Sequence, residues 1–96
     1  MITKGTEDYK KASKMANELQ NLANVERWNN NSYWNIAFCN FGHAIDNIKK
    51  TNTFAAKIAE TVDKSMNPYG FKIANLSSKQ AWILACCMVE NNISIN

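Results

Sequence analysis

The chain has 96 residues, of which 46% are hydrophobic, and its formal net charge is +3. This length suits one domain over residues 1–96, and the apolar fraction excludes a disordered chain because enough hydrophobic surface exists to offset the entropy lost on folding. The charge is lower than is usual for a dedicated nucleic-acid-binding domain, although it permits contact with RNA or an acidic protein.

The cysteine pattern and the apolar runs indicate the compartment. Three cysteines, two of them adjacent, do not form a disulfide framework and fit a reducing cytoplasm. Residues 1–11 lack the apolar core of a targeting segment, and the longest apolar run, nine residues, is about half of a membrane span. We therefore expect a soluble, cytoplasmic protein without membrane contact.

The first predicted helix covers residues 7–24. Thr6 can cap it, and Glu7 and Asp8 place negative charge in the first turn, where the helix dipole favours it. Apolar side chains then recur at helical spacing. They are Tyr9, Ala12, Ala16, Leu19, Leu22 and Ala23.

Two more helices are predicted between Ser32 and Pro68. Pro68 ends the second of them, because a proline disfavours the helical conformation at the residue before it. Ser32 and Thr53 are their candidate N-caps. The apolar stripe of the first is Trp34, Phe38, Phe41, Ile45 and Ile48. The predicted inward side chains of the second are Phe54, Ala55, Ile58, Ala59, Val62 and Met66.

The end of the chain contains the most apolar segment. Ser77 and Gln80 match a capping box, the nine residues 81–89 are all apolar, and Asn91 and Asn92 can end the helix. Residues 69–73 and 93–95 alternate with the period of a strand, which leaves open a minimal two-stranded β patch near the C-terminus. The sequence thus predicts an all-α fold, a compact bundle of about four helices.

A helix that is apolar on every side is either the central element of a small domain or a surface for another chain. The first interpretation is favoured for residues 81–89. In the second, an apolar strip remains exposed and permits a homodimer through residues 81–89. That strip would consist of Ile83, Cys86 and Cys87.

Cys39 and His43 are the residues most open to a chemical interpretation. Their spacing of four places them on one helix face, so with Cys86 or Cys87 they could bind zinc, or they could act as a thiol nucleophile and its base. The favoured interpretation is a small buried thiol beside a half-exposed imidazole. No CxxC spacing and no oxyanion donor accompany the pair, so we predict no metal, no cofactor and no catalytic activity.

An aromatic corner follows the first predicted helix. Rings, amides and one guanidinium alternate there, and such a set can stack on unpaired bases or form a protein-binding hot spot. The competing interpretation is that the two tryptophans fill the corner between two helices. The candidate contact residues are Arg27, Trp28, Asn30, Tyr33 and Trp34.

Lysines form the second candidate surface. Lys50, Lys57 and Lys64 recur every seven residues, and the segment from residue 49 to 79 contains six lysines and two acids. This spacing predicts either a phosphate-facing edge or a solvated face with weak ion pairs.

The stretch of residues 76–85, Leu-Ser-Ser-Lys-Gln-Ala-Trp-Ile-Leu-Ala, resembles a short C-terminal pattern of small phage and mobile-element proteins, LS-x-KQ-A followed by an apolar helix. Small size, fifteen asparagines, ten lysines and a missing active site also resemble the anti-CRISPR class, whose members bind and disable RNA-guided nucleases. That class shares no motif, so the resemblance transfers no functional residue. It implies a protein of the host cell cytoplasm.

These observations lead to three hypotheses of function. The first is a non-catalytic phage or mobile-element protein that binds and inhibits a host protein or ribonucleoprotein, such as a CRISPR effector nuclease. The second is a direct RNA or single-stranded nucleic-acid binding protein, whose affinity would fall steeply with salt. The third is a self-assembling structural or regulatory protein.

Overall fold

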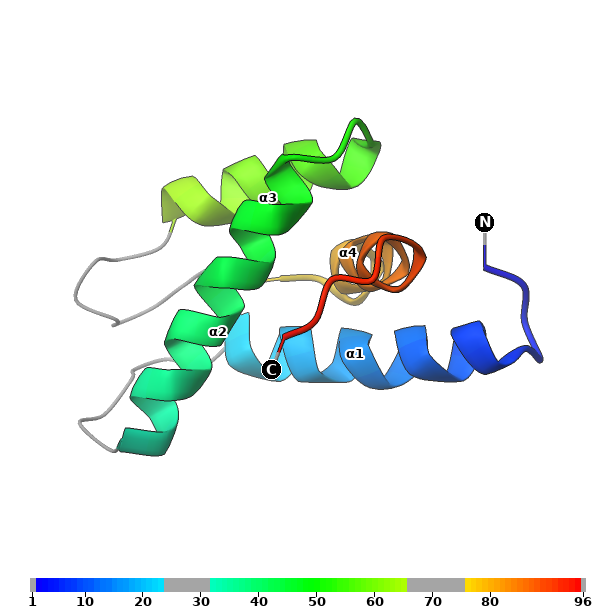
Figure 1. Cartoon of the computed structure of the whole chain (residues 1–96), viewed down its shortest axis with the longest axis horizontal. Coiled ribbons are helices and arrows are strands. Elements are labelled where there is room, and N and C mark those ends of the chain that lie inside the picture. The colour runs from blue at the N-terminus through cyan, green and yellow to red at the C-terminus, as the bar shows by residue number, and fades with distance from the viewer. Residues whose placement is uncertain (1, 24–31, 66–75, 96) are drawn as a thin grey trace.

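The computed structural model describes residues 2–23, 32–65 and 76–95. This part of the chain forms α1 (Glu7–Ala23), α2 (Ser32–Lys49), α3 (Phe54–Ser65) and α4 (Ser78–Glu90). Helix α4 lies in the middle, between α1 and α3, and contacts all three other helices (Figure 1). The prediction of an all-α bundle is confirmed.

The described residues contain no strand. Residues 93–95 continue past α4 without strand pairing, and residues 69–73 lie outside the described residues. None of the described helices has both the length and the apolar character needed to cross a membrane.

Helix α4 owes its central position to apolar side chains directed at more than one neighbour. Ala81, Leu84, Ala85 and Met88 are completely buried. Its most extensive contact is with α1. Alanine is frequent among the buried residues of both helices, and small side chains let helix axes approach closely. The interpretation of residues 81–89 as the central element is therefore confirmed for most of their surface.

The predicted apolar stripes of α1 and α2 supply part of the core. Tyr9, Ala16 and Leu22 of the α1 stripe are half-buried, and the side chains of Trp34 and Phe38 in the α2 stripe lie outside the described residues. Ala12, Leu19 and Ala23 of α1 are completely buried, and so are Phe41 and Ile45 of α2. In the part of the chain whose side chains are described, the six largest completely buried ones are Phe41, Leu19, Ile45, Ile48, Leu84 and Met88.

Phe54 is a correction to the predicted core. We expected it to face inward with Ala55 and Ile58, yet 65% of Phe54 is exposed. Phe54 is the first residue of α3, so no preceding helical turn covers it, and the core contact begins with Ala55, which is 2% exposed.

Of the predicted N-caps that fall on described helix starts, Thr6 and Ser77 are present, and the prediction for Thr53 is wrong. The Thr53 hydroxyl lies 2.8 Å from the Thr51 hydroxyl and 3.7 Å from Cys87 Sγ, and no described backbone N–H of α3 donates to it. At α1, the backbone N–H of Tyr9 donates to the Thr6 hydroxyl oxygen at 3.2 Å. At α4, the N–H of Gln80 donates to Ser77 Oγ and the N–H of Ser77 donates to Gln80 Oε1, each at 3.1 Å. These reciprocal bonds satisfy backbone donors that the helix leaves without partners.

Removal of the α4 cap should destabilise the protein measurably. Ser77→Ala is expected to lower the free energy of unfolding by about 1 kcal/mol, because the N–H of Gln80 loses its acceptor. In a domain of this size that corresponds to a fall in Tm of about 4–8 °C. Thermal unfolding followed by circular dichroism measures it. Ser77→Thr keeps a hydroxyl acceptor and is the control; equal Tm values for Ser77→Ala and the wild type would contradict the cap's role.

Helix α4 ends at the asparagine pair as predicted, and its C-terminus forms a Schellman motif. Asn92 adopts a left-handed conformation (φ 55°). Its N–H donates to the Val89 carbonyl at 3.4 Å, and the Ile93 N–H donates to the Met88 carbonyl at 2.8 Å. The turn sends the chain back over the bundle, where Ile95 is buried.

Cys87 joins this end of α4 to the turn between α2 and α3. Its Sγ lies 3.6 Å from the Thr51 hydroxyl, 3.7 Å from the Thr53 hydroxyl and 3.6 Å from Asn91 Nδ2. The alternative interpretation of residues 81–89 placed Cys87 on an exposed apolar strip with Ile83 and Cys86, and for Cys87 this alternative is wrong. Cys87 is only 6% exposed, because α4 turns that position toward the α2–α3 turn.

Candidate interaction surfaces

The predicted aromatic corner is only partly within the described structure. Arg27, Trp28 and Asn30 lie outside the described residues. Tyr33 and Trp34 belong to the first turn of α2, but their side chains are not described. The corner therefore stays a prediction.

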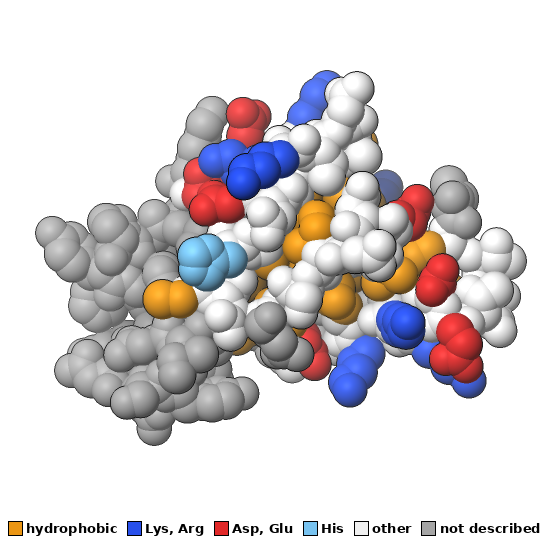
Figure 2. Space-filling model, viewed as in Figure 1, with side chains coloured by type: hydrophobic (Ala, Val, Ile, Leu, Met, Phe, Trp, Pro, Cys, Tyr) orange, Lys and Arg blue, Asp and Glu red, His pale blue; other side chains and the backbone are white. Residues whose placement is uncertain are grey.

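The predicted lysines come from two helices. Lys50 directly follows α2 and is exposed, and Lys57 is exposed on α3. Lys64 belongs to α3, with an undescribed side chain. Acidic side chains lie among the positive ones on the face that Figure 2 displays, over α2 and α3 as well as over α1. On this face the described residues form no continuous basic patch.

The positive charge of Lys49 is neutralised by an ion pair with Asp63. Its Nζ donates to Asp63 Oδ2 at 2.7 Å, joining α2 to α3. This hydrogen bond raises the pKa of Lys49, partial desolvation opposes the shift, and the charges of Asp63, Asp46 and Glu60 reinforce it. A phosphate group near Lys49 would have to compete with carboxylates that already surround it.

The pair gives the stability a pH dependence on the alkaline side. Because the pKa of Lys49 is raised in the folded protein, its stabilising contribution is complete below the ordinary lysine pKa of about 10.4 and is lost as pH rises through the raised value. Asp63→Asn should therefore destabilise the protein at pH 8 and have little effect at strongly alkaline pH. Urea unfolding of both proteins across this range measures the difference; a difference that persists unchanged would contradict the pairing.

A polar stripe runs along the outer face of α2. Asn40, His43, Asn47 and Lys50 follow one another at steps of three or four residues, so they share one helix face. Asn40 is half-buried and the other three are exposed. Within the described part of the chain, none of the four side chains makes a hydrogen bond or ion pair.

This stripe borders a wide hollow of about 610 Å³, which we call the α2 hollow. Its opposite wall is the C-terminal segment from Asn91 to Ile95, which Figure 1 shows returning past α1 toward α2. His43, the one histidine of the chain, is exposed on the α2 wall of this hollow. The hollow therefore offers amides, an imidazole and an ammonium group for hydrogen bonds to a partner.

The sequence analysis did not find the α2 hollow. Its walls are about forty to fifty-five residues apart in the chain, and they meet only because the turn after α4 reverses the backbone. The one local signal was the spacing of Asn40, His43 and Asn47 on a single helix face. The sequence pattern around His43 suggests only a pairing with Cys39.

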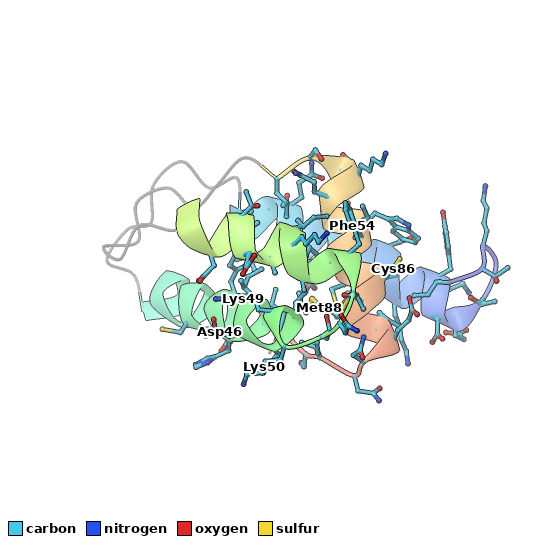
Figure 3. The ribbon with its side chains drawn as sticks, turned by 90° about the horizontal axis from the view of Figure 1, so that it is seen from above. Asp46, Lys49, Lys50, Phe54, Cys86 and Met88 are labelled. Carbon is cyan, nitrogen blue, oxygen red and sulfur yellow. The ribbon has the colours of Figure 1, made fainter. Side chains whose placement is uncertain are left out.

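A second, apolar surface lies between the start of α3 and α4. It is a groove of about 370 Å³, and its apolar lining includes Phe54 and Ala55 from α3 and Trp82, Ile83 and Cys86 from α4. We call it the α4 groove. Figure 3 labels Phe54 at the start of α3 and Cys86 on α4, and both side chains line this groove. On the α1 side, the ring of Tyr9 packs on Trp82 with ring centres 5.1 Å apart.

The thiols and His43 form no evident reactive centre. Cys39 is exposed, so the predicted buried thiol beside His43 is wrong; His43 is exposed as well. Burial raises the pKa of the Cys86 thiol, and the charge of Glu90 raises it further, so Cys86 stays protonated at neutral pH. Among the described residues, no three histidine, cysteine, aspartate or glutamate side chains come together as a metal site could require.

Comparison with known proteins adds no relative. No family model matches the chain, and neither a curated protein nor a solved structure matches it.

Proposed function

We propose that the protein is a non-catalytic binding protein that occupies a host protein or ribonucleoprotein and blocks it, as an anti-CRISPR protein does. The observation that carries this proposal is the α2 hollow. It is concave, and its α2 wall presents polar side chains that make no bond within the described chain. Polar groups that converge on a concave surface are what fixes a partner's orientation in a binding site.

The chemistry of the hollow favours a protein or ribonucleoprotein surface over free RNA. Asn40 and Asn47 each offer a donor and an acceptor, which suits backbone amides and base edges alike. The positive charge is small, because Lys50 has Asp46 one turn before it and Lys49 is paired with Asp63. Binding of free nucleic acid depends mainly on phosphate neutralisation, and these carboxylates oppose it.

The remaining features support the same proposal. The raised pKa of Cys86 disfavours a thiolate nucleophile. Tyr33, one of the predicted contact residues, lies seven residues before Asn40 on α2, the helix that forms one wall of the hollow. The phage assignment rests on the resemblance of residues 76–85 and on the asparagine and lysine content.

A cleavage assay with the host's RNA-guided nuclease tests this function. We expect the wild-type protein to abolish cleavage of a target DNA at about stoichiometric amounts, and Asn47→Arg to lose this inhibition because a long charged side chain fills the hollow. Asn17→Arg, the same change at an exposed position of α1, should inhibit like the wild type.

Two outcomes would contradict the proposal. Full cleavage in the presence of excess wild-type protein would remove the nuclease as the target. Equal inhibition by Asn47→Arg and the wild type would remove the α2 hollow as the contact surface.

A further inference from the structure

The outer stripe of α4 has a spacing that reads the same in both directions. Ile83 and Cys86 lie three residues apart in its centre, Lys79 lies four residues before Ile83, and Glu90 lies four residues after Cys86. These steps put all four residues on one helix face. Ile83 and Cys86 are half-buried, and Lys79 and Glu90 are exposed. The stripe thus has an apolar centre and opposite charges at its two ends, about 16 Å apart.

Both charges oppose the dipole of their own helix. Lys79 is in the first turn of α4, where the dipole favours acids, and Glu90 is the last residue of α4, where it favours bases. The first turn contains no acidic residue and the last turn no basic one. The stability of the isolated helix therefore gives no reason for this arrangement.

We propose that the protein forms a two-fold symmetric dimer in which α4 packs antiparallel against α4 of a second copy. A two-fold axis between Leu84 and Ala85 would place Lys79 opposite Glu90 of the second copy, and Glu90 opposite its Lys79. Ile83 would then face Cys86 of the second copy. An interface of this kind must be self-complementary, and the stripe meets that condition in charge and in apolar character.

The α4 groove supplies the rest of the interface. Phe54, at 65% exposed, stands beside Cys86 at the rim of the groove, and Trp82 lines it as well. In the antiparallel arrangement, Phe54 would cover the half of the second copy's stripe that contains Ile83. A stable specific interface buries about 800 Å² on each partner, and a single helix stripe with one flanking ring is narrower, so we expect a dissociation constant of about micromolar order.

Charge exchange tests the dimer by sedimentation velocity across a range of concentrations. The wild type should dimerise, and Lys79→Glu and Glu90→Lys should each weaken dimerisation by at least about tenfold, because like charges then meet at both ends. The double variant Lys79→Glu/Glu90→Lys should dimerise again, since the exchanged charges are again complementary. An equimolar mixture of the two single variants should form a mixed dimer.

The single variants remain folded by this account, because each charge change agrees better with the helix dipole than the native residue does. Their circular dichroism spectra and the Tm of their dilute monomers should match or exceed those of the wild type. A wild-type monomer at all concentrations, or a double variant that stays monomeric while folded, would overturn the proposal. The inhibition assay with Asn47→Arg is independent of this result, because the α2 hollow is not part of the proposed dimer contact.

Discussion

Leu84→Ala is expected to lower the free energy of unfolding by about 2–5 kcal/mol, which is a large part of the stability of a domain of this size. Leu84 is completely buried in the middle of α4, which lies between α1 and α3 and also contacts α2. The substitution removes its contacts and leaves a cavity among helices that cannot close on it fully. Urea unfolding of dilute protein measures the loss.

The neighbouring position is the matched control. Ile83 is half-buried and faces the α4 groove, so Ile83→Ala should cost the dilute monomer only about 0.5–1.5 kcal/mol. The two changes remove similar side chains one residue apart on the same helix. Equal losses would show that α4 does not present one face to the core and another to solvent, as the structure describes.

Phe41→Ala is expected to cost about 3–5 kcal/mol, enough to leave much of the protein unfolded at physiological temperature. Among the described residues Phe41 is the largest completely buried side chain, and α2 joins the core through it. Thermal unfolding by calorimetry is the measurement, and Phe41→Leu, which keeps most of the volume, should retain most of the stability.

Phe54→Ala provides the comparison with an exposed ring. The chemical change is the same, but Phe54 is 65% exposed, so the dilute monomer should change by no more than about 0.5 kcal/mol. If Phe54→Ala proved as destabilising as Phe41→Ala, the placement of Phe54 outside the core would be wrong.

The sequence is sufficient to predict structural features that depend on local chemistry. Helix starts depend on local chemistry, so Thr6 and the Ser77–Gln80 capping box identified the ends of α1 and α4 correctly. The stripe of Phe41, Ile45 and Ile48 also became buried as expected, because side chains spaced at helical intervals on one face share one environment.

Residues at the edge of a stripe were harder to assign. Phe54 and Cys87 both lie at positions where a small rotation of the helix decides burial, and the neighbouring helix sets that rotation. Cys87 is buried because it packs against the α2–α3 turn, where its Sγ contacts the hydroxyl groups of Thr51 and Thr53. Both threonines are more than thirty residues away from Cys87 in the sequence. The ion pair between Lys49 and Asp63 depends in the same way on the packing of α2 on α3.

The α2 hollow was the least accessible to prediction. Its two walls come from separate segments, and nothing in the local sequence of residues 91–95 indicates that they would face Asn40 and Asn47. Exposed asparagines are also common in turns, so their presence alone did not point to a surface.

Affinity capture from the native host, with mass spectrometry of the bound proteins, tests the central claim that the protein acts by contact through the α2 hollow. The wild type and Lys79→Glu should retain the same single host protein or ribonucleoprotein in stoichiometric amount, and Asn47→Arg should lose it. A target retained equally by all three proteins, or no specific target for the wild type, would contradict the account.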